Sequence, residues 1–558
     1  MPQNQQLISS LSNELTKVIS ETNGINLYDT LELLAYSPKL KEAPLIYKQL
    51  SEFKRLLRGF HEDEVDIYTL LKHPVSDAFF SFFQKFPLKY REEHIHLTGS
   101  LSAEFIYPRL MKLLEGPDKE IYKEKITEVY GEEAWPITSV EDVDKLIRLQ
   151  EGEQFMTYLK ILYLPKLILV DRKAHEEAAY HMAEELYYKY NVGLIRLKFT
   201  LNRTTTKKSE QIPGTENITE EDVVFGLYDG FMKFQSEHED FNFALSPSFR
   251  KEGEFYDKEN FSSKQEHFLH QVKTLLDIIK KYPFLKKHLV EIDTVGDEKE
   301  LYRKKHFMEM KAGLRRLQGH GFRIRSHHGE TWKTLRKGVQ SVDNAMNIWH
   351  LDTLEHGLSL GINPNYYFHR LYQRVLELNK QSCPLKPTSK EYRELMDMEW
   401  MVPEVRDKLI AGIPLNEKEI TIFTKTKFHT AREIEHYQHD ILNRMLNKNV
   451  SLVALPTSNI KLTNSFPDIK DHPFSWWEKK GVHLGVGTDN YITLSTDFIQ
   501  EMLILLYSDP ENLKITKLLM VVTGEARRAH ISHLLWSMRK KLIEPEEGPE
   551  AEKEIKND

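Results

Sequence analysis

The pattern of hydrophobic positions changes near residue 90. Before it, apolar residues recur at helical spacing, as in Leu31, Leu33 and Leu34, with few β-branched runs. This spacing predicts a helical N-terminal segment over residues 1–90. From residue 91 onward, short β-rich segments alternate with long amphipathic stretches, which is typical of βα units and a parallel sheet.

Eight segments have the composition of strands. They span residues 93–97, 194–199, 241–245, 289–294, 322–326, 353–355, 450–455 and 482–486. Eight βα units close a (β/α)8 barrel, whose active site lies at the carboxyl ends of the strands. We therefore predict an α/β fold of the (β/α)8 TIM type over residues 91–540.

Two regions fall outside a plain barrel. Residues 361–448, between the sixth and seventh strands, are too long for an ordinary connection, and their apolar spacing predicts a helical insertion. Large helical additions need a surface for their apolar faces, so we expect the insertion and the N-terminal segment to make either inter-subunit contacts, in a homo-oligomer, or lid contacts. Residues 541–558 are charged and nearly devoid of apolar side chains, and we expect a disordered tail.

Composition narrows the function classes. With 77 Lys and Arg against 84 Asp and Glu, the net charge of -7 gives no general attraction for double-stranded nucleic acid or an anionic membrane. The single cysteine, Cys383, excludes a disulfide framework and a cysteine-based zinc finger, so any metal must be held by His and carboxylates. No signal peptide or spanning segment stands out, and we expect a cytoplasmic protein.

Metal-ligating residue types stand at three predicted strand ends. His94 and His96 flank one residue of the first strand, so both imidazoles face the same side. His327 ends the fifth strand, with Glu330 three residues on, and Asp489 follows the eighth. Alone, a His-x-His pair is weak evidence in a chain with 24 histidines. Three histidines and a carboxylate on one rim suit zinc, with a position left for water.

The order of the motifs resembles the adenosine/AMP deaminase family of the amidohydrolase superfamily, in the form of a long, divergent bacterial member. In chain order the motifs are His94 to Gly99 (H-x-H-L-x-G), Ile292 to Glu298 (I-D-x-x-G-D-E), His327 to Glu330 (H-x-G-E), His356-Gly357, Pro456 to Asn459 (P-T-S-N) and Thr488-Asp489. The resemblance covers residues 91 to 530 or so, and leaves out the N-terminal segment and the insertion.

The resemblance implies roles for individual residues. His94, His96, His327 and Asp489 would hold one Zn²⁺ per chain. Glu330 would protonate the purine ring at N1, His356 would act as the base, and the backbone N–H of Gly296 would meet the N3 edge of the purine. The chemistry is consistent, because protonation at N1 makes C6 electrophilic and a bound metal lowers the pKa of water to about 7.

Two positions depart from the nucleoside deaminase pattern. Thr98 stands where relatives acting on free nucleosides carry an Asp that contacts the ribose 5′-OH, and a neutral residue removes a charge that would repel a 5′-phosphate. Asn490 stands where the family has a second Asp facing purine N7, to which an amide donates without needing a proton. Cations near strand ends that could meet a phosphate, each equally an ordinary solvated charge, are Arg109, Lys112, Lys198, Arg203, Arg250, Lys251 and Lys333.

Together these features predict a zinc-dependent hydrolytic deaminase. Its substrate would be a small-molecule adenine nucleoside or nucleotide (adenosine, deoxyadenosine, (d)AMP or (d)ATP), converted to the inosine form with release of ammonia. Analogy with long bacterial relatives suggests antiviral defence as the setting. Two alternatives stay open: another amidohydrolase that cleaves an amide or ester, and a non-catalytic nucleotide-binding scaffold, which predicts a damaged ligand set.

Overall fold

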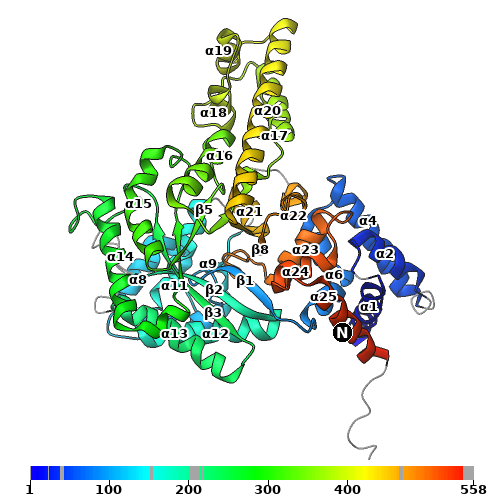
Figure 1. Cartoon of the computed structure of the whole chain (residues 1–558), viewed down its shortest axis with the longest axis vertical. Coiled ribbons are helices and arrows are strands. Elements are labelled where there is room, and N and C mark those ends of the chain that lie inside the picture. The colour runs from blue at the N-terminus through cyan, green and yellow to red at the C-terminus, as the bar shows by residue number, and fades with distance from the viewer. Residues whose placement is uncertain are drawn as a thin grey trace, which may run out of the picture. The chain divides into compact units, whose positions relative to one another are not determined.

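Eight parallel strands form one sheet in the order in which they occur along the chain, from β1 to β8 (Figure 1). Their bounds are β1 Tyr90–His96, β2 Val192–Thr200, β3 Asn242–Arg250, β4 Glu291–Val295, β5 Arg323–His328, β6 Thr353–His356, β7 Ser451–Ala454 and β8 Leu484–Val486. A parallel bridge between Ile95 and Asp489 joins the first strand to the segment after the last. The predicted (β/α)8 barrel is confirmed.

This computed structural model describes residues 2–22, 24–37, 43–150, 155–201, 214, 218–463 and 469–543. Arg203 and the tail from residue 544, which the sequence predicts to be disordered, lie outside the described residues. The chain divides into two units: a barrel unit of residues 93–184 and 195–496, and a terminal unit of residues 1–92, 185–194 and 497–558.

All eight predicted strands overlap the observed ones, and β3 differs most. Pro247 lacks a backbone N–H and suggests a strand end, so the sequence places the boundary at residue 245. The ladder continues, however, with Ser248 opposite Asp293 and Arg250 opposite Val295. Hydrogen bonding to β4 therefore extends β3 beyond Pro247, as far as Arg250.

Charged side chains meet across the inside of the barrel. Arg196 of β2 lies 2.8 Å from Glu291 of β4, and Lys198 of β2 lies 3.0 Å from Glu355 of β6. The partners come from strands that are not neighbours in the sheet, so these pairs must cross the interior. A buried charge is costly unless it is paired, and this pairing explains how strands with polar residues can line the barrel.

Helices surround the sheet of the barrel unit. They are α7 Ala103–Leu114, α8 Lys119–Tyr130, α9 Val140–Ile147, α10 Phe155–Ile161, α11 Tyr163–Leu167, α12 Arg172–Tyr190, α13 Glu220–Glu237, α14 Lys264–Lys281, α15 Lys304–Gly319, α16 Leu335–Asn344, α21 Pro456–Thr463 and α22 Phe474–Lys479. Capping residues determine where several of these helices begin. Before α13, the Thr219 side chain accepts from the N–H of Asp222, whose carboxylate accepts from that of Thr219.

The predicted insertion is helical. It contains α17 Pro364–Lys380, α18 Lys390–Asp397, α19 Pro403–Ala411 and α20 Glu417–Lys448, which stand out from the barrel as an elongated bundle (Figure 1). The buried Gln438 side chain of α20 donates to the carbonyls of Ser359 (2.8 Å) and Ile362 (2.9 Å). These bonds tie the base of the insertion to the loop after β6.

The terminal unit combines the two ends of the chain in one helical core. Its helices are α1 Pro2–Glu21, α2 Leu27–Tyr36, α4 Pro44–His61, α5 Ile67–Leu71, α6 Pro74–Gln84, α23 Phe498–Ser508, α24 Ile515–Thr523 and α25 Arg528–Ile543. Tyr507 of α23 and Ser76 of α6 are both buried, and their hydroxyls lie 2.6 Å apart. Among the described helices, none combines the length and the apolar character needed to cross a membrane.

Candidate metal and acid–base site

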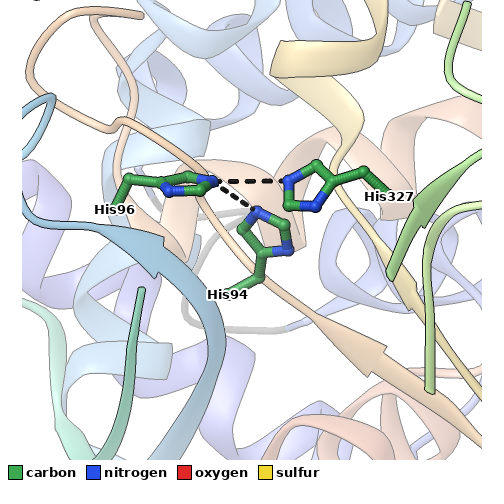
Figure 2. Close-up of side chains that lie close together, drawn as sticks. All are labelled: His94, His96 and His327. Atoms are coloured by element: carbon green, nitrogen blue, oxygen red, sulfur yellow. Dashed lines mark hydrogen bonds between the residues drawn. The ribbon is translucent and has the colours of Figure 1, made fainter. Parts of the chain in front are cut away.

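Three imidazoles converge at the carboxyl ends of β1 and β5. Nε2 of His96 lies 3.2 Å from Nε2 of His94 and 3.4 Å from Nε2 of His327 (Figure 2). Four ligands of one zinc ion, each at about 2 Å from it, lie roughly 3 to 4 Å from one another. The spacing of the three nitrogens therefore fits a shared metal.

Asp489 adds a carboxylate to this group. Its Oδ1 atom lies 3.5 Å from Nε2 of His96 and 3.7 Å from Nε2 of His94. The other oxygen, Oδ2, accepts a 2.6 Å hydrogen bond from Ser458, which leaves Oδ1 directed toward the histidines. The structure thus brings together all four residues that the sequence predicts as ligands. Ser458, the third residue of the motif Pro456 to Asn459, had no role assigned from the sequence.

Two buried carboxylates orient two of the histidines. Nδ1 of His94 lies 2.8 Å from Glu355, and Nδ1 of His327 lies 3.2 Å from Asp293. Each carboxylate accepts a hydrogen bond from the N–H at Nδ1, so the proton stays on Nδ1 and Nε2 keeps its lone pair toward the other imidazoles. Lys198 lies between these carboxylates, 3.0 Å from Glu355 and 3.1 Å from Asp293, and balances their charge.

The protonation states suit metal ligation. Burial, with help from Lys198 and from the neighbouring imidazoles, holds the pKa values of His94, His96 and His327 well below their usual range. Neutral imidazoles are the form that binds a metal. Three neutral nitrogens and one carboxylate oxygen fit a divalent ion such as zinc.

Glu330 and His356, the residues that the sequence predicts as acid and base, lie beside the histidines. Nδ1 of His356 lies 2.8 Å from Oδ1 of Asn459. That oxygen only accepts, so Nδ1 carries the proton and Nε2 keeps its lone pair. The buried Nε2 atom has no hydrogen-bond partner among the residues that the structure describes. Burial, followed by the nearby charge of Glu298, raises the pKa of Glu330 to about 8. A neutral carboxylic acid thus faces an unprotonated imidazole nitrogen.

Two site residues adopt backbone conformations that non-glycine residues rarely use. His356 has φ of 67° and Asp489 has φ of 63°. His356 is the last residue of β6, and Asp489 lies in the segment that follows β8. Such a conformation costs on the order of 1 kcal/mol or more and persists where the surroundings impose it, often at functional sites.

Asn490, which the sequence places opposite purine N7, has two hydrogen-bond partners within the chain. Its Nδ2 atom donates to Oη of Tyr158 at 2.5 Å and to Oδ1 of Asp489 at 2.7 Å, so the amide donor is already engaged within the chain. Thr98 lies half-buried in the turn after β1. The next residue, Gly99, approaches Asn490 so closely that an added Cβ would lie 1.8 Å from its Oδ1.

Gly296 lies directly after β4 with φ of 114°, a conformation that favours glycine. A Cβ at this position would also lie 2.1 Å from Oε2 of Glu252. The close approach and the positive φ both require a glycine here.

Most cations considered for a 5′-phosphate have other partners. Lys198 is fully buried between two carboxylates, and Lys251 donates to the backbone carbonyl of His327. Arg109 lies 2.7 Å from Glu177, and Lys333 lies 2.7 Å from Glu300. Lys198 and Lys251 thus bind groups of the protein itself at the rim of the barrel. Because both are buried, they are not available as ligands of a phosphate.

Sequence reasoning gave no organising role to several residues of the site, chiefly Glu355, Lys198, Asn459 and Tyr158, although it singled out Lys198 as a cation and Asn459 as a motif member. Glu355 immediately precedes His356, and this adjacency was the only local signal for it. Tyr158 comes from α10, in the long connection between β1 and β2, where nothing in the pattern sets it apart. Its contact with Asn490 arises only when the chain closes.

The fold and the site define a (β/α)8 barrel with a histidine-rich potential metal site at the carboxyl ends of its strands. No family model matches the sequence, and no curated protein matches it. Among solved structures, the chain is similar to an adenine deaminase from Arthrobacter aurescens. The two chains are 13% identical over 82% of this chain and 99% of that one, with a TM-score of 0.45.

Two further solved structures are similar to a comparable degree. The N6-methyl-AMP deaminase from Arabidopsis thaliana is 15% identical over 82% of this chain and 98% of that one, with a TM-score of 0.46. An amidohydrolase from Burkholderia ambifaria with bound Zn is 14% identical over 83% of this chain and 94% of that one, with a TM-score of 0.42.

Proposed function

We propose that the chain is a zinc-dependent hydrolytic deaminase of the adenosine/AMP deaminase family, acting on an adenine nucleoside or 5′-nucleotide. The observation that carries this proposal is the acid–base pair beside the histidine cluster: Oε2 of Glu330 lies 3.8 Å from Nε2 of His356. Deamination needs a proton donor for the ring and an acceptor for a proton of water, and this pair supplies both.

The proposed ligands of zinc are His94, His96, His327 and Asp489, whose donor atoms converge. Bound there, zinc would supply the Lewis acidity that makes water a nucleophile at neutral pH. Glu355 and Asp293 would keep the two imidazoles that they contact in the tautomer required for binding.

Glu330 is the proposed acid. Its raised pKa keeps the proton on the carboxyl group at neutral pH, and it delivers that proton to N1 of the purine ring. The C6 atom then accepts a water oxygen, and the base His356 takes the water proton on Nε2. His356 gives this proton to the amino group, which leaves C6 as ammonia, and the proton of the C6 hydroxyl passes to the carboxylate of Glu330, while N1 keeps the proton it received. The products are the inosine form of the substrate and ammonia, so atoms and charge balance.

The substrate class rests on the resemblance and on Thr98. A neutral Thr98 leaves room for a 5′-phosphate as well as for a free 5′-OH, and the candidate substrates are adenosine, deoxyadenosine, (d)AMP and (d)ATP. In a cell the activity would change adenine nucleotide pools, and by analogy with long bacterial relatives it would serve antiviral defence.

Both alternatives are less well supported. Against amide or ester hydrolysis stand the pairing of the H-x-G-E motif at His327 to Glu330 with His356-Gly357 and the absence from the sequence of a recognisable metal-bridging lysine. A non-catalytic scaffold does not require three converging imidazoles or backbone conformations as costly as those of His356 and Asp489.

The test is turnover by the zinc-loaded protein. Ammonia release and the absorbance change from adenine to hypoxanthine are measured across adenosine, deoxyadenosine, AMP, dAMP, ATP and dATP, with Glu330→Gln as the control for a contaminating enzyme. We expect turnover of at least one compound by the wild type and a rate about 10²- to 10⁴-fold lower in the variant. Absence of ammonia with all six compounds contradicts the proposal.

A further inference from the structure

The carboxylate of Glu298 accepts hydrogen bonds from three backbone N–H groups of the loop that carries Glu330. Oε1 of Glu298 accepts hydrogen bonds from the N–H groups of Glu330 (2.6 Å) and Thr331 (2.8 Å). Oε2 accepts from the N–H of Gly329 (3.0 Å) and lies 3.1 Å from Nδ1 of His328. Three consecutive backbone donors and one imidazole thus meet a single side chain that is 3% exposed.

The turn after β4 directs Glu298 toward this loop. Gly296 makes the turn with φ of 114°, and the next N–H, that of Asp297, donates to Oε1 of Glu252 at 2.9 Å. Asp297 is exposed, whereas Glu298 is buried. The turn therefore places one acidic side chain in solvent and directs the next into the protein.

The buried charge of Glu298 has a counterion. Nζ of Lys251, 2% exposed, lies 4.0 Å from Oε2 of Glu298 and donates to the carbonyl of His327. Burial alone would raise the pKa of Glu298, but Lys251 and the hydrogen bond with His328 bring it down to about 2. The acceptor therefore stays ionised at neutral pH.

We propose that Glu298 is the positioning residue for the acid: by holding the N–H groups of Gly329, Glu330 and Thr331, it sets where the carboxyl group of Glu330 lies. The inference rests on the proposed function, in which Glu330 delivers the proton. The N–H of Glu330 is itself one of the bonded groups, so any rotation of this backbone moves the acid. A displacement of about 1 Å at a reacting group can cost about 100-fold in rate.

Only a carboxylate satisfies all four donors. An ionised carboxylate offers about four acceptor positions on its two oxygens. A glutamine of the same shape offers one accepting oxygen and an NH₂ group that donates. Glu298→Gln therefore places a donor against at least one N–H of the loop and leaves it unsatisfied. This variant changes the hydrogen bonds while nearly preserving the volume.

The experiment compares Glu298→Gln with Glu300→Gln in the zinc-loaded protein. Glu300 lies in the same loop and is exposed, and its pairing with Lys333 is on the surface, so it matches the loss of charge without the loss of the bonds. Hydrogen exchange of residues 329–331 is measured first, since it does not depend on any substrate. The kcat and KM for deamination and the zinc content are measured next.

For Glu298→Gln we expect exchange of the three amides to rise by about tenfold or more. We also expect kcat to fall about 100-fold while KM changes less than about threefold and zinc content stays at the wild-type level. For Glu300→Gln we expect wild-type values in all four measurements. A loss in kcat without a matching change in KM or zinc separates positioning from general damage.

The inference is overturned by unchanged exchange, by faster exchange with wild-type kcat, or by parallel losses in KM and zinc content. If Glu298→Gln does not fold, Glu298→Asp replaces it, because the charge stays and the reach shortens by one methylene. A wild-type kcat in that variant also overturns the inference. A wild-type protein that turns over no adenine compound refutes the proposed function itself, whereas an active wild type with an equally active Glu298→Gln variant refutes only the role of Glu298.

Discussion

The Oε2 atom of Glu330 lies 3.8 Å from Nε2 of His356, and the two side chains come from the ends of different strands. Burial acts on the two groups in opposite directions. It raises the pKa of Glu330 to about 8 and lowers that of His356, so the acid keeps its proton and the base lacks one at neutral pH. A pair of titratable groups separated in this way is suited to acid and base roles.

The metal site predicts a specific loss. His327→Ala removes one of three converging nitrogens, and we expect zinc to fall from about one equivalent per chain to a small fraction of that. Elemental analysis after dialysis measures the content. His429→Ala, at an exposed histidine of α20, is the control and should retain its zinc. An unaltered zinc content in His327→Ala contradicts the assignment.

If Glu330 is the acid, both its substitution and a rise in pH should lower the rate of deamination. Glu330→Gln should bind zinc normally and lose about 10²- to 10⁴-fold in kcat, because an amide cannot deliver a proton; His356→Ala should be similarly impaired. The wild-type acid is active when protonated, and its pKa of about 8 means that kcat/KM should decline as pH rises through that value. A rate that rises steadily across pH 7 to 9 would show that another group supplies the proton.

Thr98 predicts how the substrate preference responds to charge. Thr98→Asp places a carboxylate where a 5′-phosphate is proposed to lie, so kcat/KM for AMP should fall by on the order of 10- to 100-fold more than for adenosine. The ratio of the two values cancels general damage, and Thr98→Asn serves as the neutral control. Equal losses on both substrates, or a wild-type preference for adenosine, would leave Thr98 without a role in phosphate acceptance.

Glu394 predicts how stability depends on pH. This buried residue of α18 accepts hydrogen bonds from the N–H of Leu335 (2.8 Å) and the hydroxyl of Tyr367 (2.6 Å). Burial raises its pKa from 4.5 to about 7, so between these values the folded state binds more protons than the unfolded state. The free energy of unfolding should therefore fall as pH rises from about 4.5 to 7, by up to about 3 kcal/mol.

Glu394→Gln removes this titration and keeps an accepting oxygen. We expect the variant to unfold at a higher temperature than the wild type at pH 8, and the difference to shrink at pH 5. Glu404→Gln, at an exposed position of α19, should show no such change. Parallel pH profiles for the wild type and Glu394→Gln would mean that Glu394 does not carry the effect.

The insertion predicts self-association. Met396, Met401 and Ile413 lie in or between α18, α19 and α20, and they are 47%, 91% and 51% exposed. We expect light scattering to give a mass of at least two chains and Met401→Glu to lower it, since a charge disfavours an apolar contact. Met308→Glu, at a similarly exposed methionine of α15, is the control. A monomeric wild-type protein refutes this expectation.

The barrel and the convergence of its candidate ligand residues could be predicted because the signals for them are local. The composition of a segment such as Leu484 to Val486 is enough to predict a strand. In a parallel barrel, the carboxyl ends of all the strands lie at one rim. His94, His96, His327 and Asp489 therefore needed no long-range information to be placed together. Each stands at or just after the end of its own strand.

The remaining features depend on contacts between distant residues. Local pattern marks Lys198 as a cation, but only the closed barrel decides that it is buried between Asp293 and Glu355 and cannot meet a phosphate. Residues 1–92 and 497–558 belong to one unit, and the spacing of apolar residues along the chain could not predict this association. Sequence by itself determined the strands, their order and the residue types at their ends. The tertiary structure decided which of those side chains are paired, buried and held in place, because pairing and desolvation depend on what the folded chain brings alongside each group.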